Sequence, residues 1–548
     1  MSAEVRAEKS AQQVAVLDSA HIGDIEGAFG TIRVDEEAPQ RSLSRKMKTL
    51  LAIVGPGLIV MVGDNDAGAF GTYTNAGQNY GTSLLWTLLL LIPVLYVNQE
   101  MVLRLGAVAG VGHARLIFER FGRFWGAFSV IDLFLLNALT IVTEFIGISL
   151  GLHYLNIPQI PGIIIAAVAI IAAVSTGSFR RFERICLILV VFSLLLIPIV
   201  VMVHPSLLDT ARGFFIPTLP GGSSQLSTVM LLIIGIVGTT IAPWQLFFQQ
   251  SYVIDKRITP RFMAYERVDL WVGIVVVVVG ASAIMAFTAA TFAGHPEQGI
   301  FTDALGVARG LRQYVGPVAG VLFALALIDA SIIGAAAVGL STTYALGDTL
   351  GIKHSLHRKP SDAKGFYAIF AGLLIVSAVI VLIPGSPLGL LTVGVQTLAG
   401  VLLPSATVFL LLLCNDKEVL GPWVNGRALN IFTSIVIGVL VLLSVVLTVA
   451  VLFPGISGGV ILWILGGGGA AGLLGAVAMA VVGRVRGVVY TPVDRTGRET
   501  WRMRPVALLN RPELSLSRRI GLSVLRLYLI VAVVLAIVRV IQLAVGHS

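Results

Sequence analysis

Charged residues are scarce in this chain of 548 residues, because Asp, Glu, Lys and Arg together make up only 12% of it. A soluble domain has about 25%. Cysteine is scarcer still, and the two present, Cys186 and Cys414, lie in apolar segments. Two thiols exclude a disulfide framework and argue against a thiolate metal site. The first 46 residues contain no apolar core of the kind that a cleavable signal peptide needs.

Apolar residues are abundant, at 56% of the chain, and they form runs long enough to cross a bilayer as helices. These runs differ from the short alternating segments of an outer-membrane barrel. We therefore predict an all-α integral membrane protein with thirteen spans. The expected spans are residues 50–73, 83–105, 124–152, 162–177, 185–203, 227–252, 268–293, 316–347, 366–384, 388–413, 428–453, 460–482 and 519–545.

The loops between these runs alternate in charge, with Lys and Arg concentrated in one set and rare in the other. By the positive-inside rule, the basic set is cytoplasmic, which places the N-terminus in the cytoplasm of a cell-membrane protein. The net charge of +9 then reflects these loops and gives no indication of nucleic-acid binding. The basic loops are 104–123, 180–184, 256–267, 353–364, 417–427 and 484–519, and the others are 75–81, 156–162, 204–225, 294–316, 384–389 and 454–459.

Composition divides the chain into three parts. Residues 1–46 are polar and predict a cytoplasmic tail without fixed structure, residues 47–453 hold eleven spans, and residues 454–548 add helices around the basic loop 484–519. Arginines in that loop suit anionic lipid headgroups. In the loop 353–364, His354 and His357 are expected to be solvated and not to bind metal.

Two spans are interrupted near their middle. In the first, Asp64, Asn65 and Asp66 stand between glycines, and acids at the bilayer midplane are costly unless they face a cavity, a partner or an ion. In the sixth, Pro243 removes a helical hydrogen bond. Two broken helices, each opening a half of five spans, predict a leucine-transporter-type fold of two inverted five-helix repeats, with extra C-terminal helices.

The two breaks offer oxygen ligands and no sulfur or imidazole. Carboxylate, amide and carbonyl oxygens suit magnesium, calcium and manganese. Each acid also has a structural alternative. Asp64 could only cap a broken helix, and Glu144 could only hydrogen-bond to a neighbouring broken helix instead of taking part in ion passage. For Asp329 in the eighth span, a place along the pathway and a place away from it are both open. The candidate ligands in the breaks are Asp64, Asn65, Asp66, Thr240, Gln245 and the carbonyls near Ala67 and Ile241.

Around these residues the chain resembles the NRAMP (natural resistance-associated macrophage protein) family of divalent-metal transporters, over residues 50–453. The resemblance implies that Asp66 is a metal ligand and that Gln396 lies near the metal. It rests on Gly55-Pro56-Gly57 with Asp66 to Gly68, Thr143 to Gly147, Val237 to Thr240 with Pro243, and Gln396 eight residues before Pro404.

Departures from the family motifs resemble the branch of NRAMP-related magnesium transporters. Asp66-Ala67-Gly68-Ala69 stands where the family has Asp-Pro-Gly-Asn, and Ala242-Pro243-Trp244 where it has Met-Pro-His. Gln249 aligns with a further family histidine and Ile141 with an acid. The resemblance therefore implies transport of Mg²⁺, with Mn²⁺ tolerated. Ala69 and Ala242 leave room for a partly hydrated ion. Trp244 is expected to form a wall of the cavity, and the alternative is that it only fills the volume between its apolar neighbours.

The substitutions also imply movement of the ion down its electrochemical gradient without proton coupling. Open alternatives are a proton-coupled Mn²⁺ or Fe²⁺ symporter, a carrier of another solute such as an amino acid, and a non-transporting metal sensor. A membrane enzyme is disfavoured because no nucleophile–base pair or phosphate loop is present. No cofactor is predicted. The expected partners are a divalent cation and membrane lipid, with no protein partner indicated.

Overall fold

The computed structural model describes residues 15–34, 42–383, 388–453, 456–485, 493–510 and a few positions between 512 and 530. Helices dominate it. The first elements are η1 (Ser19–His21), β1 (Ile25–Gly27), β2 (Gly30–Ile32), α2 (Leu43–Ile53), α3 (Pro56–Gly63), α4 (Ala67–Tyr80), α5 (Trp86–Ala109), α6 (His113–Phe121), α7 (Arg123–Tyr154), α8 (Gln159–Val174), α9 (Phe179–Phe192), η2 (Ser193–Leu195), α10 (Leu196–Val203) and α11 (Leu207–Phe215). They are followed by α12 (Gly222–Thr240), α13 (Pro243–Asp255), η3 (Pro260–Phe262), α14 (Met263–Phe292), α15 (Ala304–Tyr314), α16 (Pro317–Leu350), α17 (Lys364–Val381), α18 (Leu388–Leu413), α19 (Lys417–Leu420), η4 (Gly421–Trp423), α20 (Arg427–Leu452), α21 (Gly458–Val485) and η5 (Val506–Leu508).

Within the described ranges, nine helices are long and apolar enough to cross a membrane, or eleven if each of two bent pairs is one span. The prediction of thirteen exceeds this number for two reasons. The fourth predicted span is α8, a shorter apolar helix, and the thirteenth, 519–545, lies mostly outside the described residues. The chain is therefore a multi-pass membrane protein.

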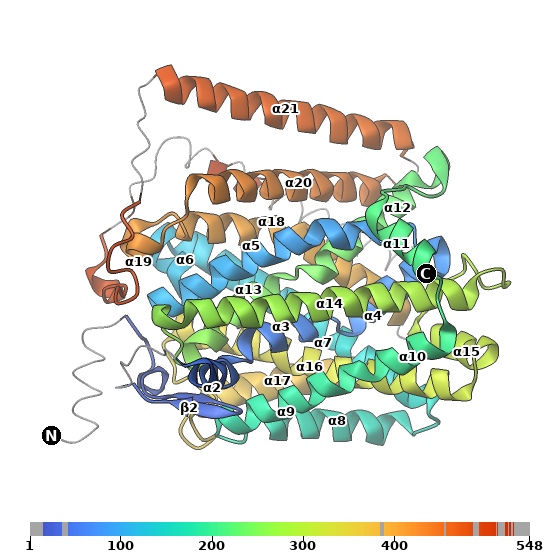
Figure 1. Ribbon diagram of the computed structural model, residues 1–548, viewed down its shortest axis with the longest axis horizontal. Helices are drawn as coiled ribbons and strands as arrows, with labels where there is room; N and C mark the ends of the chain where they lie inside the picture. The colour runs from blue at the N-terminus through green and yellow to red at the C-terminus, as the bar shows by residue number, and fades with distance from the viewer. Residues whose placement is uncertain are drawn as a thin grey trace.

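The spans form an elongated bundle whose loops gather at two ends (Figure 1). One end, here called the basic end, carries α6, α19, the β1–β2 hairpin and the loops rich in Lys and Arg. The opposite end carries α11 and α15. The loops that fall within the described residues therefore follow the predicted alternation between the two ends. The loops 384–389, 454–459 and 484–519 lie partly outside those residues, and the orientation of the two ends across a membrane stays a prediction.

Both predicted helix breaks are present. α3 ends at Gly63 and α4 begins at Ala67, and Asp66 between them has an extended backbone (φ −74°, ψ −174°). α12 ends at Thr240, and α13 begins with Pro243 in the first turn, where its missing N–H leaves no helical bond unmade. The long helices α14 and α16 pack along the broken first span and hold its halves in place.

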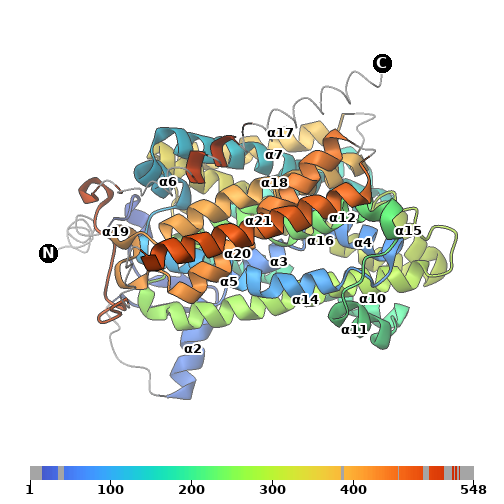
Figure 2. The same cartoon turned by 90° about the horizontal axis from the view of Figure 1, so that it is seen from above.

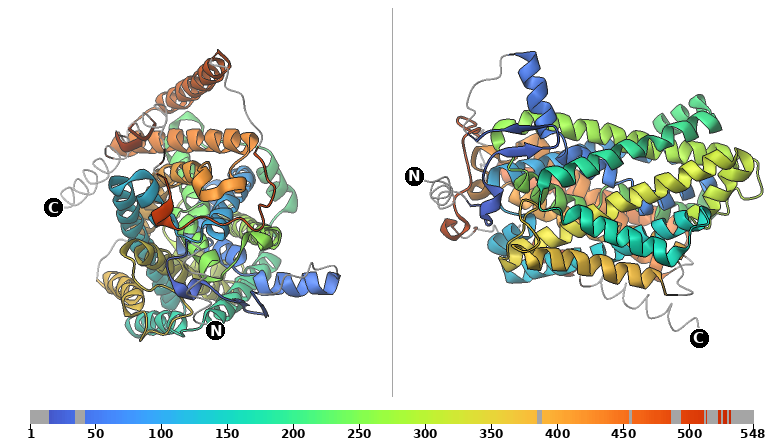
Figure 3. Two further views of the ribbon diagram at one scale, coloured as in Figure 1. Left: turned by 90° about the vertical axis from the view of Figure 1, so that its left-hand side faces the viewer. Right: turned by 90° about the horizontal axis from the view of Figure 1, so that it is seen from below.

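α20 and α21 lie on one side of the bundle, with α21 outermost (Figures 1 and 2). α2 meets α3 at 45° and projects sideways at the basic end, beside the hairpin (Figures 2 and 3). The bend coincides with Gly55, whose φ of +152° suits glycine.

The prediction of an N-terminal tail without fixed structure is wrong for residues 15–34. This segment, here called the N-terminal strap, contains η1 and an antiparallel hairpin in which Ile25 pairs with Ile32. A Cβ built on Gly27 would lie 1.8 Å from the carbonyl oxygen of Ala52, so the hairpin sits directly on α2. The strap is ordered by contacts with distant parts of the chain, which its polar composition does not reveal.

His354, predicted to be solvated, is instead buried, and His357 is half-buried. The Nε2 of His21 in the strap lies 3.0 Å from the His354 carbonyl oxygen and 3.4 Å from a carboxylate oxygen of Asp255. Burial lowers the pKa of His21. The carboxylates of Asp255, Asp18 and Asp348 oppose this effect, and the His354 imidazole adds to it.

We expect acid to loosen the strap. A docked strap favours neutral His21, whereas an undocked His21 takes up a proton below a pH of about 6.5, so docking weakens as the pH falls through that value. Amide hydrogen exchange at Ala28 and Ile32, corrected for its intrinsic pH dependence, should become faster between pH 7 and about pH 5.5. His21→Gln should remove most of this change. Equal protection at both pH values would contradict the expectation.

Candidate functional site

The break in the first span holds a buried carboxylate, that of Asp64. Asp64 is fully buried at the end of α3, and neither of its carboxylate oxygens has a hydrogen-bond partner among the described residues. Asp66 is close enough for the two charges to repel. An isolated buried carboxylate is strongly unfavourable, so this arrangement suits a bound cation.

Asp66 caps α4, because its Oδ1 accepts a hydrogen bond of 2.8 Å from the Ala69 N–H. The Asp66 side chain also lies within hydrogen-bonding reach of the Glu144 carboxyl on α7. Glu144 accepts at Oε2 from the Ala67 N–H at 3.2 Å, while its Oε1 has no partner in the described part of the chain. The hydrogen bond from the broken first span to Glu144, which the sequence left open, is therefore present. The Oε1 atom of Glu144 takes no part in that bond and is available for a role in ion passage.

The sequence left open that Asp64 caps a broken helix, but it is Asp66 that caps α4. Ala67, a candidate for a freed carbonyl, is the first residue of α4, and the contact it makes at the break is through its N–H. Gln396 on α18 reaches the same turn, since a Cβ built on Gly68 would lie 1.7 Å from its Nε2. Asp66, Glu144 and Gln396 are thus gathered around the start of α4.

On the sixth span, Ile241 and Ala242 have non-helical backbone (φ −133°, ψ 80° and φ −84°, ψ 144°), which takes the Ile241 carbonyl out of the helical hydrogen-bond pattern. The Ala242 carbonyl accepts from the Gln245 N–H at 3.2 Å. The Thr240 hydroxyl is committed, because it donates to the Ile236 carbonyl at 2.6 Å and lies 2.7 Å from the Tyr73 hydroxyl. Thr240 thus braces α12 against α4.

Trp244 is buried against the end of α3, with its Cη2 3.7 Å from a Cβ position built on Gly63. The Ser341 hydroxyl donates to its carbonyl oxygen at 2.9 Å. Trp244 therefore packs beside the first-span break, and its role as a wall of the cavity stays a prediction. Ala69 and Ala242 are buried as well.

Asn65 and Asp329 lie apart from the group at the start of α4. Asn65 donates through Nδ2 to the Val277 carbonyl at 3.2 Å, and so faces α14. Both Asn65 and Asp329 line a cavity of about 360 Å³, otherwise mostly aliphatic, between α10, α14 and α16. The three consecutive residues of the break thus face different parts of the molecule. Among the predicted ligands, Asn65 has the least support, because its side chain points to α14 and away from Asp66.

A line of amides along α5 and α13 leads from the sixth-span break toward the basic end. Gln99 donates through Nε2 to Gln245 Oε1 at 3.1 Å, and both side-chain polar atoms of Gln249 are buried without partners among the described residues. Asn98 adds a buried Nδ2 that has no partner within the described ranges. Sequence reasoning missed Asn98 and Gln99, although three consecutive polar residues, 98–100, interrupt the apolar run there.

Near the basic end the same line meets His113, whose Nδ1 lies 3.1 Å from Gln250 Oε1. Burial lowers the pKa of His113 to about 4, and the contact with Gln250 only partly opposes this. His113 is therefore neutral at ordinary pH and places no positive charge beside the amides.

On the other side of the break, a small cavity of about 20 Å³ runs from Ala67 and Thr143 to Phe301 and Asp303, in the loop at the opposite end. That volume holds about one water molecule. The site therefore lies between a narrow connection to the opposite end and the amides of α5 and α13.

In the described part of the chain, no group of three or more His, Cys, Asp or Glu side chains is arranged to hold a metal ion. Any ion at the break would need amide or carbonyl oxygens beside the carboxylates.

Residues 57–450 match the model of the family described as natural resistance-associated macrophage protein-like. The chain belongs to this family. The fold and the transporter class predicted from the sequence are therefore confirmed, and an enzyme is set aside.

The chain is similar in sequence to metal transporters and in fold to a solved transporter structure. The divalent metal cation transporter MntH of Ralstonia nicotianae is 29% identical over 398 residues, which cover 69% of this chain and 86% of the relative. MntH of Bacillus subtilis is 25% identical over 421 residues, covering 74% and 93%. A solved structure of the Eremococcus coleocola manganese transporter, in complex with an aromatic bis-isothiourea substituted compound, superposes with a TM-score of 0.61 at 20% identity, covering 82% of this chain and 97% of that one.

Proposed function

We propose that this NRAMP-family chain carries divalent cations across the membrane, with Mg²⁺ preferred and Mn²⁺ accepted, and that the ion moves down its electrochemical gradient without proton coupling. The observation that carries the proposal is the fully buried Asp64 carboxylate, which has no hydrogen-bond partner among the residues the structure describes and stands beside Asp66 at a helix break. Two such charges are compensated by a doubly charged ion.

The preference for Mg²⁺ rests on the donor atoms. The candidate side-chain ligands at the breaks are carboxylates, amides and one hydroxyl, and the positions where the family carries a methionine and a histidine hold Ala242 and Trp244. Oxygen ligands suit Mg²⁺ and Mn²⁺, whereas a thioether favours softer transition ions. The names of the relatives point to divalent metals in general, and that of the solved structure to manganese.

Retained hydration is part of the proposal, because Mg²⁺ gives up its waters reluctantly. The cavity at Ala67 holds about one water, so a partly hydrated ion can pass there only if this cavity widens toward the opposite end. The ion then leaves past Gln245 and Gln249, whose uncharged amides solvate it without holding it tightly.

The decisive experiment is uptake by proteoliposomes of Mg²⁺, Mn²⁺ and Ca²⁺, supplied separately and in competition. We expect Mg²⁺ uptake above the protein-free leak and inhibition of it by Mn²⁺. Uptake of Mn²⁺ with no measurable Mg²⁺ uptake would favour the second candidate, a manganese symporter. Binding of metal without flux of any ion would favour a sensor.

A pair of substitutions tests the role of the donor atoms. Restoring the family residues with Ala69→Asn and Ala242→Met should raise the ratio of Mn²⁺ to Mg²⁺ uptake by about tenfold, because a soft ligand is added and space for water is lost. The control pairs Ala69→Asn with Ala242→Leu, which fills a similar volume without sulfur. An unchanged ratio in the methionine variant would contradict the proposed hydrated site.

A further inference from the structure

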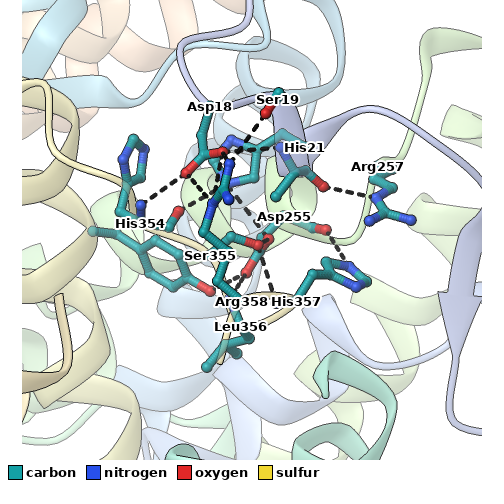
Figure 4. Close-up of polar contacts among 12 residues, drawn as sticks. Asp18, Ser19, His21, Asp255, Arg257, His354, Ser355, Leu356, His357 and Arg358 are labelled. Carbon is teal, nitrogen blue, oxygen red and sulfur yellow. Dashed lines mark hydrogen bonds and ion pairs between the residues drawn. The ribbon is translucent and has the colours of Figure 1, made fainter. Parts of the chain in front are cut away.

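The N-terminal strap, residues 15–34, precedes the family match at residue 57 and is anchored at the basic end by unusually many polar contacts (Figure 4). Asp18 is at their centre. Its carboxylate accepts from Arg358 at 2.5 to 3.1 Å and from the His354 N–H at 2.9 Å. Both partners lie in the loop between α16 and α17, so Asp18 ties the strap to that loop.

His354 carries a positive charge in this cluster. Burial disfavours its imidazolium, but the Asp348 carboxylate, 2.9 Å from Nε2, outweighs burial and raises the pKa of His354 to about 9. Hydrogen bonding to Arg358 holds the pKa of the Asp18 carboxyl below its usual range although burial opposes this. At neutral pH the Asp18 carboxylate of the strap therefore faces two cationic side chains of the loop, His354 and Arg358.

A second set of contacts joins the strap to the end of α13. Arg257 donates from Nε to the Ala20 carbonyl and from Nη1 to the Asp24 carbonyl, each at 2.9 Å. Asp255 receives the His21 contact described above, and the Ser355 hydroxyl donates to it at 2.5 Å. The second half of the broken sixth span is thus held to the strap and to the same loop.

A third set reaches the first span and α9. The Ala28 N–H donates to Glu183 Oε2 at 2.6 Å, and Glu183 Oε1 accepts from Lys256 Nζ at 2.6 Å. The same ammonium donates to the Ile53 and Val54 carbonyls at 2.6 and 2.9 Å, where α2 turns into α3. One buried network therefore joins the strap, the start of the first span and the end of the sixth.

We propose that the N-terminal strap is a latch that holds the basic end of the transporter closed. For an ion to leave at this end, the start of the first span and the end of α13 must separate, and the strap bridges both. The strap can bind both segments only while the start of the first span and the end of α13 lie side by side. Docking of the strap therefore shifts the population toward the state in which the basic end is closed. This inference rests on the proposed function only in taking the basic end as a side of ion exchange.

The test measures access to the basic end directly. In a background with Cys186→Ala and Cys414→Ala, Ile53→Cys places a thiol at a position that is fully buried where α2 ends. Its labelling rate with a membrane-impermeant maleimide reports opening, in full-length protein reconstituted in liposomes. Asp18→Asn and, separately, Arg358→Gln should each raise this rate by about tenfold, since each removes a charged, partly buried hydrogen-bonded pair.

Asp24→Asn is the matched control, because the Asp24 carboxylate accepts from the Val34 N–H inside the strap, and the hydrogen bond from Arg257 is made to the main-chain carbonyl of Asp24, which the substitution keeps. Its labelling rate should equal that of the parent. A second reporter, Ala76→Cys in the buried middle of α4, separates opening from unfolding, since only unfolding would expose it.

Faster labelling of Ile53→Cys with Ala76→Cys still protected supports the latch. Parent-like labelling in both the Asp18 and Arg358 variants overturns it, and so does equal acceleration at both reporters. Labelling needs no metal flux, so failure of Mg²⁺ uptake would overturn the proposed function while leaving the latch supported.

Discussion

Replacing Asp66 with asparagine should reduce divalent-metal uptake to the protein-free leak while the protein stays folded. The Asp66 carboxylate has two tasks, because it caps α4 through the Ala69 N–H and supplies one of the two neighbouring charges at the break. Asparagine is as good a helix N-cap as aspartate and has nearly the same volume. The variant therefore removes the charge and keeps the cap.

Asp66→Ala is the companion variant, because it removes both the charge and the cap. Loss of the cap costs about 1 kcal/mol, so this protein should melt at a slightly lower temperature than Asp66→Asn, with uptake equally absent. Uptake should be measured with fluorescent indicators in proteoliposomes and stability by thermal unfolding in detergent. Wild-type uptake by folded Asp66→Asn would show that capping is the whole role of Asp66 and would contradict the proposed site.

The breaks could be predicted because their causes are local. Acids between glycines and a proline within apolar runs cannot continue a helix in lipid without compensation, so both interruptions were visible in the sequence. The direction of each side chain could not be predicted in the same way. Asp64, Asn65 and Asp66 are consecutive, yet Asn65 turns to α14 while Asp66 turns to α7, because neighbouring helices decide what each side chain meets.

The amides of α5 show a second limit. Asn98 and Gln99 stand toward the end of a predicted span, where polar residues usually mark the membrane surface. Only the packing of α5 on α13 shows that Gln99 meets Gln245 inside the bundle. The strap shows a third limit, since its order depends on Arg358, His354 and Glu183, all more than 150 residues away.

Movement of the ion without protons is the other prediction with a large expected effect. Positions where the family has titratable groups hold Ile141, Trp244 and Gln249, which cannot carry a proton. Gln99 and Gln245 on the way to the basic end cannot either, and His113 is neutral. A bound dication also keeps the site carboxylates ionised. The driving force must then come from the ion gradient and the membrane potential.

A potential of about 100 mV, negative inside, contributes roughly 4.6 kcal/mol to the uptake of a doubly charged ion, or about three powers of ten in its equilibrium ratio. Clamping this potential with a potassium gradient and valinomycin should therefore drive strong Mg²⁺ accumulation, and reversing it should abolish accumulation. A pH-sensitive dye inside the same liposomes should show no acidification beyond the protein-free leak. Acidification that depends on metal and disappears in Asp66→Asn would contradict uncoupled transport. Such a result would assign the transported proton to the carboxyls of Asp66 and Glu144, because these two groups contact each other at the start of α4 and can share a proton.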